Sequence, residues 1–328
     1  MKRRAPADRD LSSSLTRLSR HGPRALSALL LLLACASCAG ARSSPSPHGP
    51  LGALVLPAEG RSLVMLDGHD GRVVSWPALV QRARRADVVL WGESHGHPQG
   101  LAAAAFVFEE LLEDEQLSPA VALEFLTRDQ QLGLDDFLSG VTDEAGMVRA
   151  LGLSKSSFPN GHRAMVRGAK RAGAQVWAAN APRRYVSLAR KRGYPFLSSL
   201  GPRQREQFVL PRALTTGEYR ERFEQIMAES GSLPPAAAVE ATFRSQNLWD
   251  ATMADSVRQA LRAGGKPAML VVGHFHVGFD GGLVQRVRAA APGRAILTVA
   301  VLSQSADTLQ DEDRGRADVV IYAGERSD

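Results

Sequence analysis

Four apolar segments of this chain are each followed by a polar residue of a type that binds ligands or catalyses reactions. Gly92-Glu93-Ser94-His95 follows one segment, and Gly273-His274-Phe275-His276 follows another. Glu124 and Asn180 follow the other two. Carboxylates and imidazoles can exchange protons with a substrate or bind a metal ion together. The residue types therefore predict acid–base chemistry or ligand binding, provided that the fold brings the four places together.

The apolar segments are predicted to be buried strands of one sheet. They cover residues 87–91, 120–123, 175–179 and 268–272, and helical patterns such as 99–115 and 162–172 lie between them. This alternation predicts an α/β fold, with a mostly parallel central sheet flanked by helices. Parallel strands all end at one edge of the sheet, where open α/β sheets bind their ligands. We therefore expect the polar residues to share that edge.

Three further features complete the predicted domain. Residues 63–66 and 73–75 flank a turn and are expected to form a hairpin. Residues 296–301 and 319–322 are expected to be the last strands. Helices over about 183–263, including a long one at 235–263, form a helical insertion between two core strands. An insertion at the carboxyl edge would serve as a lid or as a surface for a partner.

Each polar residue also has a purely structural interpretation. Ser94 or His95 could cap the helix that follows, and Asn180 could cap a helix or form an Asx turn. Glu124, at the end of a buried strand, needs a partner, and Arg128 or Arg183 could supply a salt bridge. These alternatives stay open at the level of the sequence.

Two histidines and one segment of the long helix add to the predicted cluster. His274 and His276 are separated by one residue, so in an extended segment their side chains point to one face. On the long helix, Asp250 could face the carboxyl edge of the sheet. Trp249 beside it is interpreted as a core residue.

The N-terminus has the pattern of an export signal. Residues 1–34 contain a basic leader and an apolar run over 25–34, which is too short to span a bilayer. Cys35 and Cys38 follow directly and are the only cysteines. We interpret 1–34 as a lipoprotein signal peptide, with Cys35 or Cys38 as the lipidated residue. Residues 35–59 are then a flexible Ser/Pro tether, and 60–328 form the domain. The protein is expected in the cell envelope, anchored to a membrane by lipid, with its domain outside the cytoplasm.

The charge of the chain is concentrated in the leader. The formal net charge is +6, and residues 1–34 supply +5 of it through seven Lys/Arg and two Asp, so the remainder carries +1. A domain so close to neutral does not have the excess of positive charge that nucleic-acid binding requires. Nucleic acid is therefore not an expected partner.

Five blocks of this sequence, in order, resemble the ChaN-like haem-binding lipoproteins, a branch of the superfamily that contains the Tiki and TraB proteins and the erythromycin esterases. The blocks are 90–95, 122–124, 177–183, 246–254 and 273–277. The family pattern Gly-Glu-x-His is matched by Gly92, Glu93 and His95, and Gly-x-x-His is matched by Gly273 and His276. His274 stands where the family often has asparagine.

The resemblance implies an envelope lipoprotein that binds haem, or another iron-linked small molecule, and assists haem and iron uptake. Some relatives pair two subunits around stacked haems with tyrosine as the iron ligand, which implies a homodimer as a further partner. No tyrosine here matches that ligand, and His162 lies near where many relatives have one. The implied cofactor-binding residues are Glu93, His95, Glu124, His162, Asn180, Arg183, His274 and His276, with Arg183 pairing with haem propionates.

A hydrolase is the alternative function, because the superfamily includes hydrolases and the polar set exceeds what haem capture requires. Glu93, His95 and His276 could hold a divalent metal that activates water. In that case Glu93 and His95 would be the catalytic residues, with Glu93 as the base. A mechanism without metal could use His95 as the general base.

Overall fold

The computed structural model describes residues 54, 56–154, 156–229 and 234–324. The predicted signal peptide, Cys35, Cys38 and most of the tether lie outside the described residues, so those assignments stay predictions. Among the helices described, none has the length and apolar character needed to cross a bilayer.

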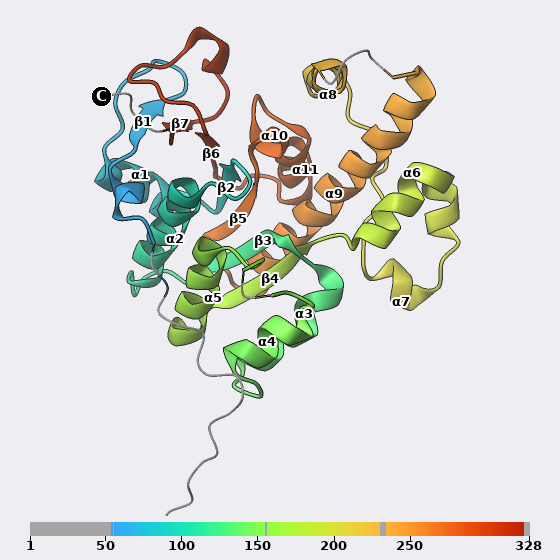
Figure 1. Cartoon of the computed structure of the whole chain (residues 1–328), viewed down its shortest axis with the longest axis horizontal. Helices are drawn as coiled ribbons and strands as arrows, with labels where there is room; N and C mark the ends of the chain where they lie inside the picture. Colours follow the sequence, from blue (N-terminus) through green and yellow to red (C-terminus); the bar gives the residue numbers. More distant parts are fainter. Residues whose placement is uncertain (1–53, 55, 155, 230–233, 325–328) are drawn as a thin grey trace, which may run out of the picture. The chain divides into compact units, whose positions relative to one another are not determined.

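Seven strands form one sheet in the order β1-β7-β6-β2-β5-β3-β4 (Figure 1). β2 lies inside the sheet and pairs in parallel with both β5 and β6, while β1 pairs antiparallel with β7. The predicted α/β fold with a mostly parallel sheet is therefore confirmed. The strands are β1 Val64–Asp67, β2 Val88–Glu93, β3 Ala120–Thr127, β4 Gln175–Asn180, β5 Ala268–Gly273, β6 Ile296–Leu302 and β7 Val319–Tyr322.

Helices connect the strands and cover both faces of the sheet. Four of them, α6 to α9, lie between β4 and β5 (Figure 1). The helices are α1 Trp76–Arg85, α2 Pro98–Leu112, α3 Gln131–Leu138, α4 Glu144–Ala150, α5 Asn160–Ala172, α6 Arg183–Ser198, α7 Pro202–Arg205, α8 Glu218–Glu229, α9 Ala236–Arg262, α10 His274–Val277 and α11 Gly282–Ala290.

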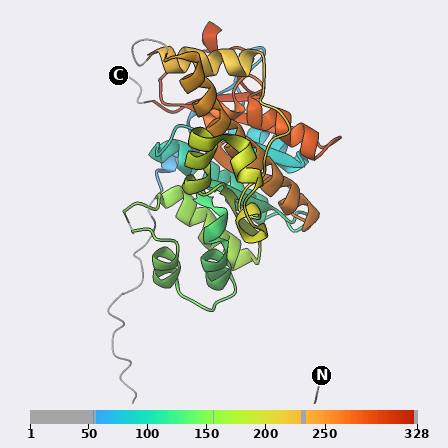
Figure 2. The same ribbon diagram turned by 90° about the vertical axis from the view of Figure 1, so that its right-hand side faces the viewer.

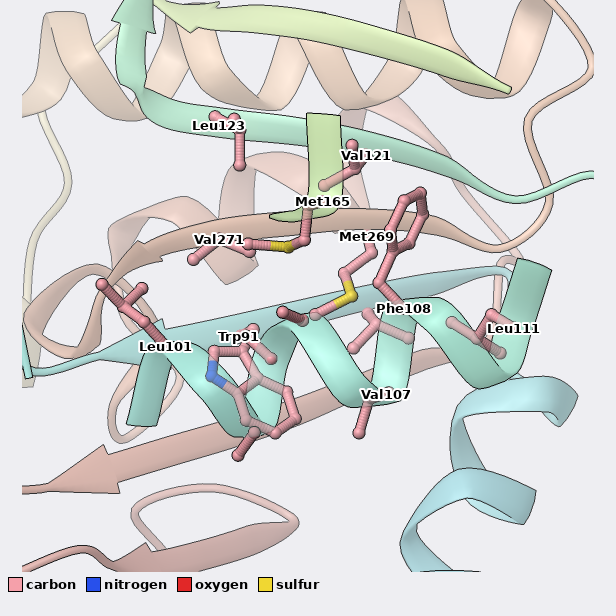
Figure 3. Close-up of a cluster of buried hydrophobic side chains, with 14 of the residues drawn as sticks. Trp91, Leu101, Val107, Phe108, Leu111, Val121, Leu123, Met165, Met269 and Val271 are labelled. Atoms are coloured by element: carbon pink, nitrogen blue, oxygen red, sulfur yellow. The ribbon is translucent and has the colours of Figure 1, made fainter. Parts of the chain in front are cut away.

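Successive strand residues point to opposite faces, and each face has its own apolar core. On one face, Trp91 and its alternate neighbours pack against α1, α2 and α5, and Figure 3 shows Trp91, Leu101 and Phe108 in this cluster. On the other face, Leu90 and Val272 pack against α9 and α11. Because both faces are covered, most strand residues are apolar. Glu93 and Asn180 are the last residues of β2 and β4, whereas Glu124 lies within β3, just past the residues that pair with β5.

The predicted hairpin over 63–66 and 73–75 forms only as a short antiparallel contact. Leu66 bridges Val73, with backbone hydrogen bonds of 2.8 Å from Asp67 to Arg72 and from Val74 to Met65, while β1 pairs along its length with β7. The reason is local, because Ser75 caps α1 by accepting a hydrogen bond from the N–H of Ala78. The chain is therefore already entering a helix where the second hairpin strand would have to continue.

Candidate functional site

Glu93 and His95 form a hydrogen-bonded pair at the end of β2, in which Glu93 is buried and His95 is exposed. Glu93 is buried, and its Oε1 lies 3.0 Å from Nδ1 of His95, whose side chain is 72% exposed. The hydrogen bond to Glu93 raises the pKa of His95, against an opposing effect of burial. The second carboxylate oxygen of Glu93 is buried and has no hydrogen-bond partner among the described residues.

Two glycines let β2 and β5 bring these side chains close together. A Cβ on Gly92 would lie 2.9 Å from Cα of His274 and 3.0 Å from the carbonyl oxygen of Val299. A Cβ on Gly273 would lie 2.9 Å from Cε1 and Nε2 of His95. A Cβ atom does not come this close to another heavy atom. The ends of β2 and β5 therefore lie this near to their neighbours because neither glycine has a side chain.

Glu124 joins the cluster from β3, whose register with β4 shifts after Leu123. Its Oε2 accepts a hydrogen bond of 2.7 Å from the N–H of Gly273, and its Oε1 lies 3.6 Å from Nε2 of His276. The alternative salt bridge with Arg128 does not form, because Arg128 binds Asp255 at 2.8 Å. Glu124 therefore ties β3 to the last residue of β5 and to His276 of α10.

His276 is the buried centre of the cluster. Its Nδ1 lies 2.5 Å from Oδ1 of Asp250, and the other oxygen of Asp250 accepts a hydrogen bond of 2.8 Å from Tyr219. Nε2 of Gln246 lies 3.3 Å from Nε2 of His276. Burial by itself lowers the pKa of His276, but the charge and hydrogen bond of Asp250 and the charge of Glu124 raise it to about 9. His276 is therefore a buried cation at neutral pH.

The expectation that His274 and His276 point to one face is wrong. The segment is the short helix α10, in which two residues apart means a rotation of about 200°. His276 turns towards Asp250, whereas Nδ1 of His274 is buried with no hydrogen-bond partner in the described chain. Burial, together with the charge of Arg316, lowers the pKa of His274 to about 4.

Three other predicted site residues do not join the hydrogen-bonded cluster. Asn180 accepts a hydrogen bond of 2.9 Å from the N–H of Ala181, a local turn, and Arg183 is exposed at the start of α6. His162 is buried on α5, its ring 5.2 Å from that of Phe125. Burial and the nearby charge of His95 lower the pKa of His162 to about 3, so it is neutral. The helix-capping alternative for Ser94 or His95 is also wrong, because His97 caps α2.

Sequence reasoning missed Tyr219 and Gln246, and it raised Asp250 without assigning it to the site. Gln246 and Asp250 are four residues apart on α9, so they share one face of that helix. This spacing, within the block 246–254, is the sequence signal that could have pointed to them. Tyr219 lies on α8 and gives no such signal, because its partner is 31 residues away.

The residues described contain no group of three or more His, Cys, Asp or Glu side chains arranged to hold a metal ion. The divalent metal expected on Glu93, His95 and His276 is therefore not supported. The physical reason is that three of the four ring nitrogens of His95 and His276 already have other neighbours. Nδ1 of His95 faces Glu93, and the nitrogens of His276 face Asp250, Gln246 and Glu124.

The fold agrees with that of a solved ChaN structure. Among curated proteins, none matches this chain. The solved structure of cofacial haem binding to ChaN of Campylobacter jejuni matches with a TM-score of 0.61 and 19% identity, over 79% of this chain and 96% of its own. An erythromycin esterase variant in its open conformation matches at a TM-score of 0.42 and 13% identity, over 73% of this chain and 77% of its own.

A family model connects the site to this fold. The model described as haem-binding uptake, Tiki superfamily, ChaN matches residues 79–287, which include β2, β3 and the loop after β5. The match does not favour the hydrolase alternative, because it is to the haem-binding branch. Since it spans more than half of the chain, this protein belongs to the ChaN family of haem-binding uptake proteins.

Proposed function

We propose that this protein binds haem at the carboxyl edge of its sheet, with His95 as the iron ligand. The supporting observation is an exposed imidazole whose Nδ1 lies 3.0 Å from a buried carboxylate. In the described part of the chain, Nε2 of His95 has no hydrogen-bond partner. Metal-ligating histidines usually have their other ring nitrogen on a carboxylate, which orients the ring, and histidine is a common axial ligand of haem iron.

The tyrosines fit the iron less well than His95 does. The hydroxyls of Tyr194, Tyr219 and Tyr322 donate hydrogen bonds to Arg244, Asp250 and Asp313. Burial raises the pKa of all three, which disfavours the phenolate that iron would bind. Tyr185, the fourth, is buried with its ring against Phe208. A bound haem would therefore be held through imidazole, which differs from the tyrosine that the resemblance implies.

Arg183 is the proposed partner of the haem propionates. It is exposed at the first position of α6, directly after the end of β4, and no ion pair to it exists among the residues described. A guanidinium group binds carboxylates with two parallel hydrogen bonds. Glu124 and His276 would act behind His95 by fixing the end of β5 and α10. Roles for Asn180, His162 and His274 stay predictions.

The cellular role that we propose is haem capture in the envelope by a lipid-anchored protein that assists iron uptake. It is supported by the family and by the signal pattern of residues 1–34. The related ChaN binds haem cofacially, and an exposed His95 would leave one face of a haem open. We therefore propose that a second copy of this chain covers that face, as a homodimer.

Titration with haemin tests the proposal. The wild-type protein should give a saturable Soret shift, and His95→Ala should weaken binding at least tenfold and change the spectrum. His69→Ala is the matched control, because His69 is an exposed histidine in a turn that lies outside the cluster. The same affinity and spectrum in His95→Ala and wild type would overturn the assignment of His95. Absence of any shift in the wild type would overturn haem binding itself.

A further inference from the structure

The segment between β4 and α8 holds an unusual concentration of positive charge. Residues 181–217 contain seven Arg, one Lys and a single acidic residue, Glu206, which gives a net charge of +7. The chain after residue 34 carries only +1, so the rest of it is acidic on balance. The domain is therefore electrically polar, with its positive pole on α6, α7 and the loops around them.

On α6 this charge lies along one face. From Arg183 to Lys191 the exposed residues recur at helical spacing, and four of these five are basic: Arg183, Arg184, Ser187, Arg190 and Lys191. We call these four basic residues the α6 stripe. The opposite face, with Tyr185, Val186 and Ala189, packs in a cluster that includes Leu248 of α9. The stripe therefore points away from α9, and Figure 2 views the domain from the side on which α6 lies.

The stability of α6 does not explain the stripe. Arg183 and Arg184 stand at the N-terminal end of the helix, where the helix dipole disfavours cations. Arg184 pairs with Asp129, but Arg183, Arg190 and Lys191 have no ion pair within the described residues. Like charges on one helix face repel one another. An anionic partner would remove this repulsion, whereas solvent only screens it.

We propose that the α6 stripe docks on an anionic membrane surface, with Arg190 and Lys191 on lipid phosphate groups and Arg183 at the end nearest the proposed haem site. The stripe is an exposed helix face and spans about 12 Å from Arg183 to Lys191, at about 1.5 Å per residue, which suits a broad charged plane. Clusters of basic residues on an amphipathic helix are typical of binding to anionic lipid. Half-buried Phe196, which lies under the guanidinium group of Arg192, is in the same segment and offers apolar contact with the interface. This inference does not depend on haem binding.

The contact would also orient the domain. α6 begins three residues after Asn180, the last residue of β4, so the stripe starts at the edge of the sheet that holds Glu93 and His95. A domain lying on the stripe would hold the mouth of this site close to the membrane. The lipid anchor predicted from the sequence would keep it there, and the stripe would fix which face is presented.

Vesicle co-sedimentation with the full chain tests this inference. The probes are phosphatidylcholine vesicles with and without phosphatidylglycerol, at low salt and at about 1 M salt, where the Debye length is about 3 Å. Each basic residue near an anionic surface is worth about fivefold in binding, or about 1 kcal/mol. We expect R190E/K191E to lose at least about 25-fold of the salt-sensitive binding to anionic vesicles and to keep haem binding.

The matched control is R85E/R149E, which makes the same change in net charge at two exposed arginines on α1 and α4. It should bind anionic vesicles like the wild type. If the stripe variant does not fold, R190Q/K191Q removes the two charges more gently and should lose about 25-fold. Equal losses in the stripe and control variants would overturn the inference and attribute binding to net charge alone. No loss in the stripe variants would overturn it too and attribute binding to the basic leader.

Discussion

At the scale of single residues, the site combines one buried histidine with one exposed histidine. His276 is buried and protonated, and it is held by Asp250 and Glu124. His95 is exposed, and Glu93 raises its pKa. A histidine binds iron only through a neutral ring nitrogen, so His95 must lose its proton to serve as a ligand.

Haem affinity is therefore expected to fall as the pH drops through the pKa of His95, which lies above the ordinary value. Glu93→Gln removes the largest cause of that increase, so the midpoint should move to lower pH. Haemin titrations between about pH 5 and pH 9, followed at the Soret band, measure both midpoints. Superimposable profiles for Glu93→Gln and wild type would contradict the role given to Glu93.

The Asp250–His276 pair should control stability at alkaline pH. The folded pKa of His276, about 9, lies above its unfolded value, so its contribution is complete below the unfolded pKa and is lost as the pH rises through about 9. Asp250→Asn leaves a buried cation with one partner fewer and should lower the free energy of unfolding by about 3 kcal/mol at neutral pH.

Tyr219→Phe is the control for that variant, because it removes the hydroxyl that binds Asp250 but keeps the ion pair. It should cost about 1 kcal/mol and keep the alkaline loss of stability. Urea unfolding at several pH values separates the two variants. Equal pH dependence in Asp250→Asn and wild type would show that the pair does not set the alkaline limit.

At the scale of elements, the two glycines at the strand ends have different neighbours. A side chain at Gly92 would meet the backbone of His274 and Val299, which cannot move without displacing α10 and β6. A side chain at Gly273 would meet the end of the His95 imidazole, which can rotate away. The absence of a side chain at Gly92 therefore allows the sheet to pack, and its absence at Gly273 allows His95 to keep its orientation.

Gly92→Ala is accordingly expected to lower the free energy of unfolding by about 1–3 kcal/mol, as overpacking does. Gly273→Ala should change stability much less but weaken haemin binding. Thermal unfolding and Soret titration of the same two proteins make the comparison. A Gly273→Ala protein that binds haemin like the wild type would show that His95 need not stand where the structure has it.

The elements that could be predicted are those with a local pattern. Runs such as Val88–Trp91 and Ala268–Val272 are buried on both faces, so composition alone indicated strands, and the ends of those strands indicated Glu93, His95, Glu124 and His276. α10 has only four residues and no periodicity. The pairing of β1 with β7 and the contact of Tyr219 with Asp250 join distant segments, and no short stretch of sequence encodes either.

At the scale of the whole domain, the site is built at the centre of the sheet. β2 and β5 both have parallel neighbours on each side, and Glu93 and Gly273 are paired at their ends. The amides of Leu270 and Val271 lie in these ladders, between two covered faces. Opening the base of the site therefore requires breaking the core.

Hydrogen exchange should show this difference within the domain. The amides of Leu270 and Val271 are expected to exchange only through global unfolding, so their protection should equal the free energy of unfolding. Amides of α6, which is interrupted at Gly193 with φ of 74°, should exchange through smaller openings. Mass spectrometry of exchange with and without haemin measures both, and equal protection of the two regions would contradict the expectation.

The position of β7 has a consequence for how the protein is made. β1 is joined to the sheet through β7, which lies between β1 and β6. The first strand therefore cannot pair until the last strand has formed. A growing polypeptide cannot complete this edge until Val319–Tyr322 have left the ribosome. The export signal that the sequence predicts would require such a delay, since translocation through a narrow channel needs a chain that has not yet folded.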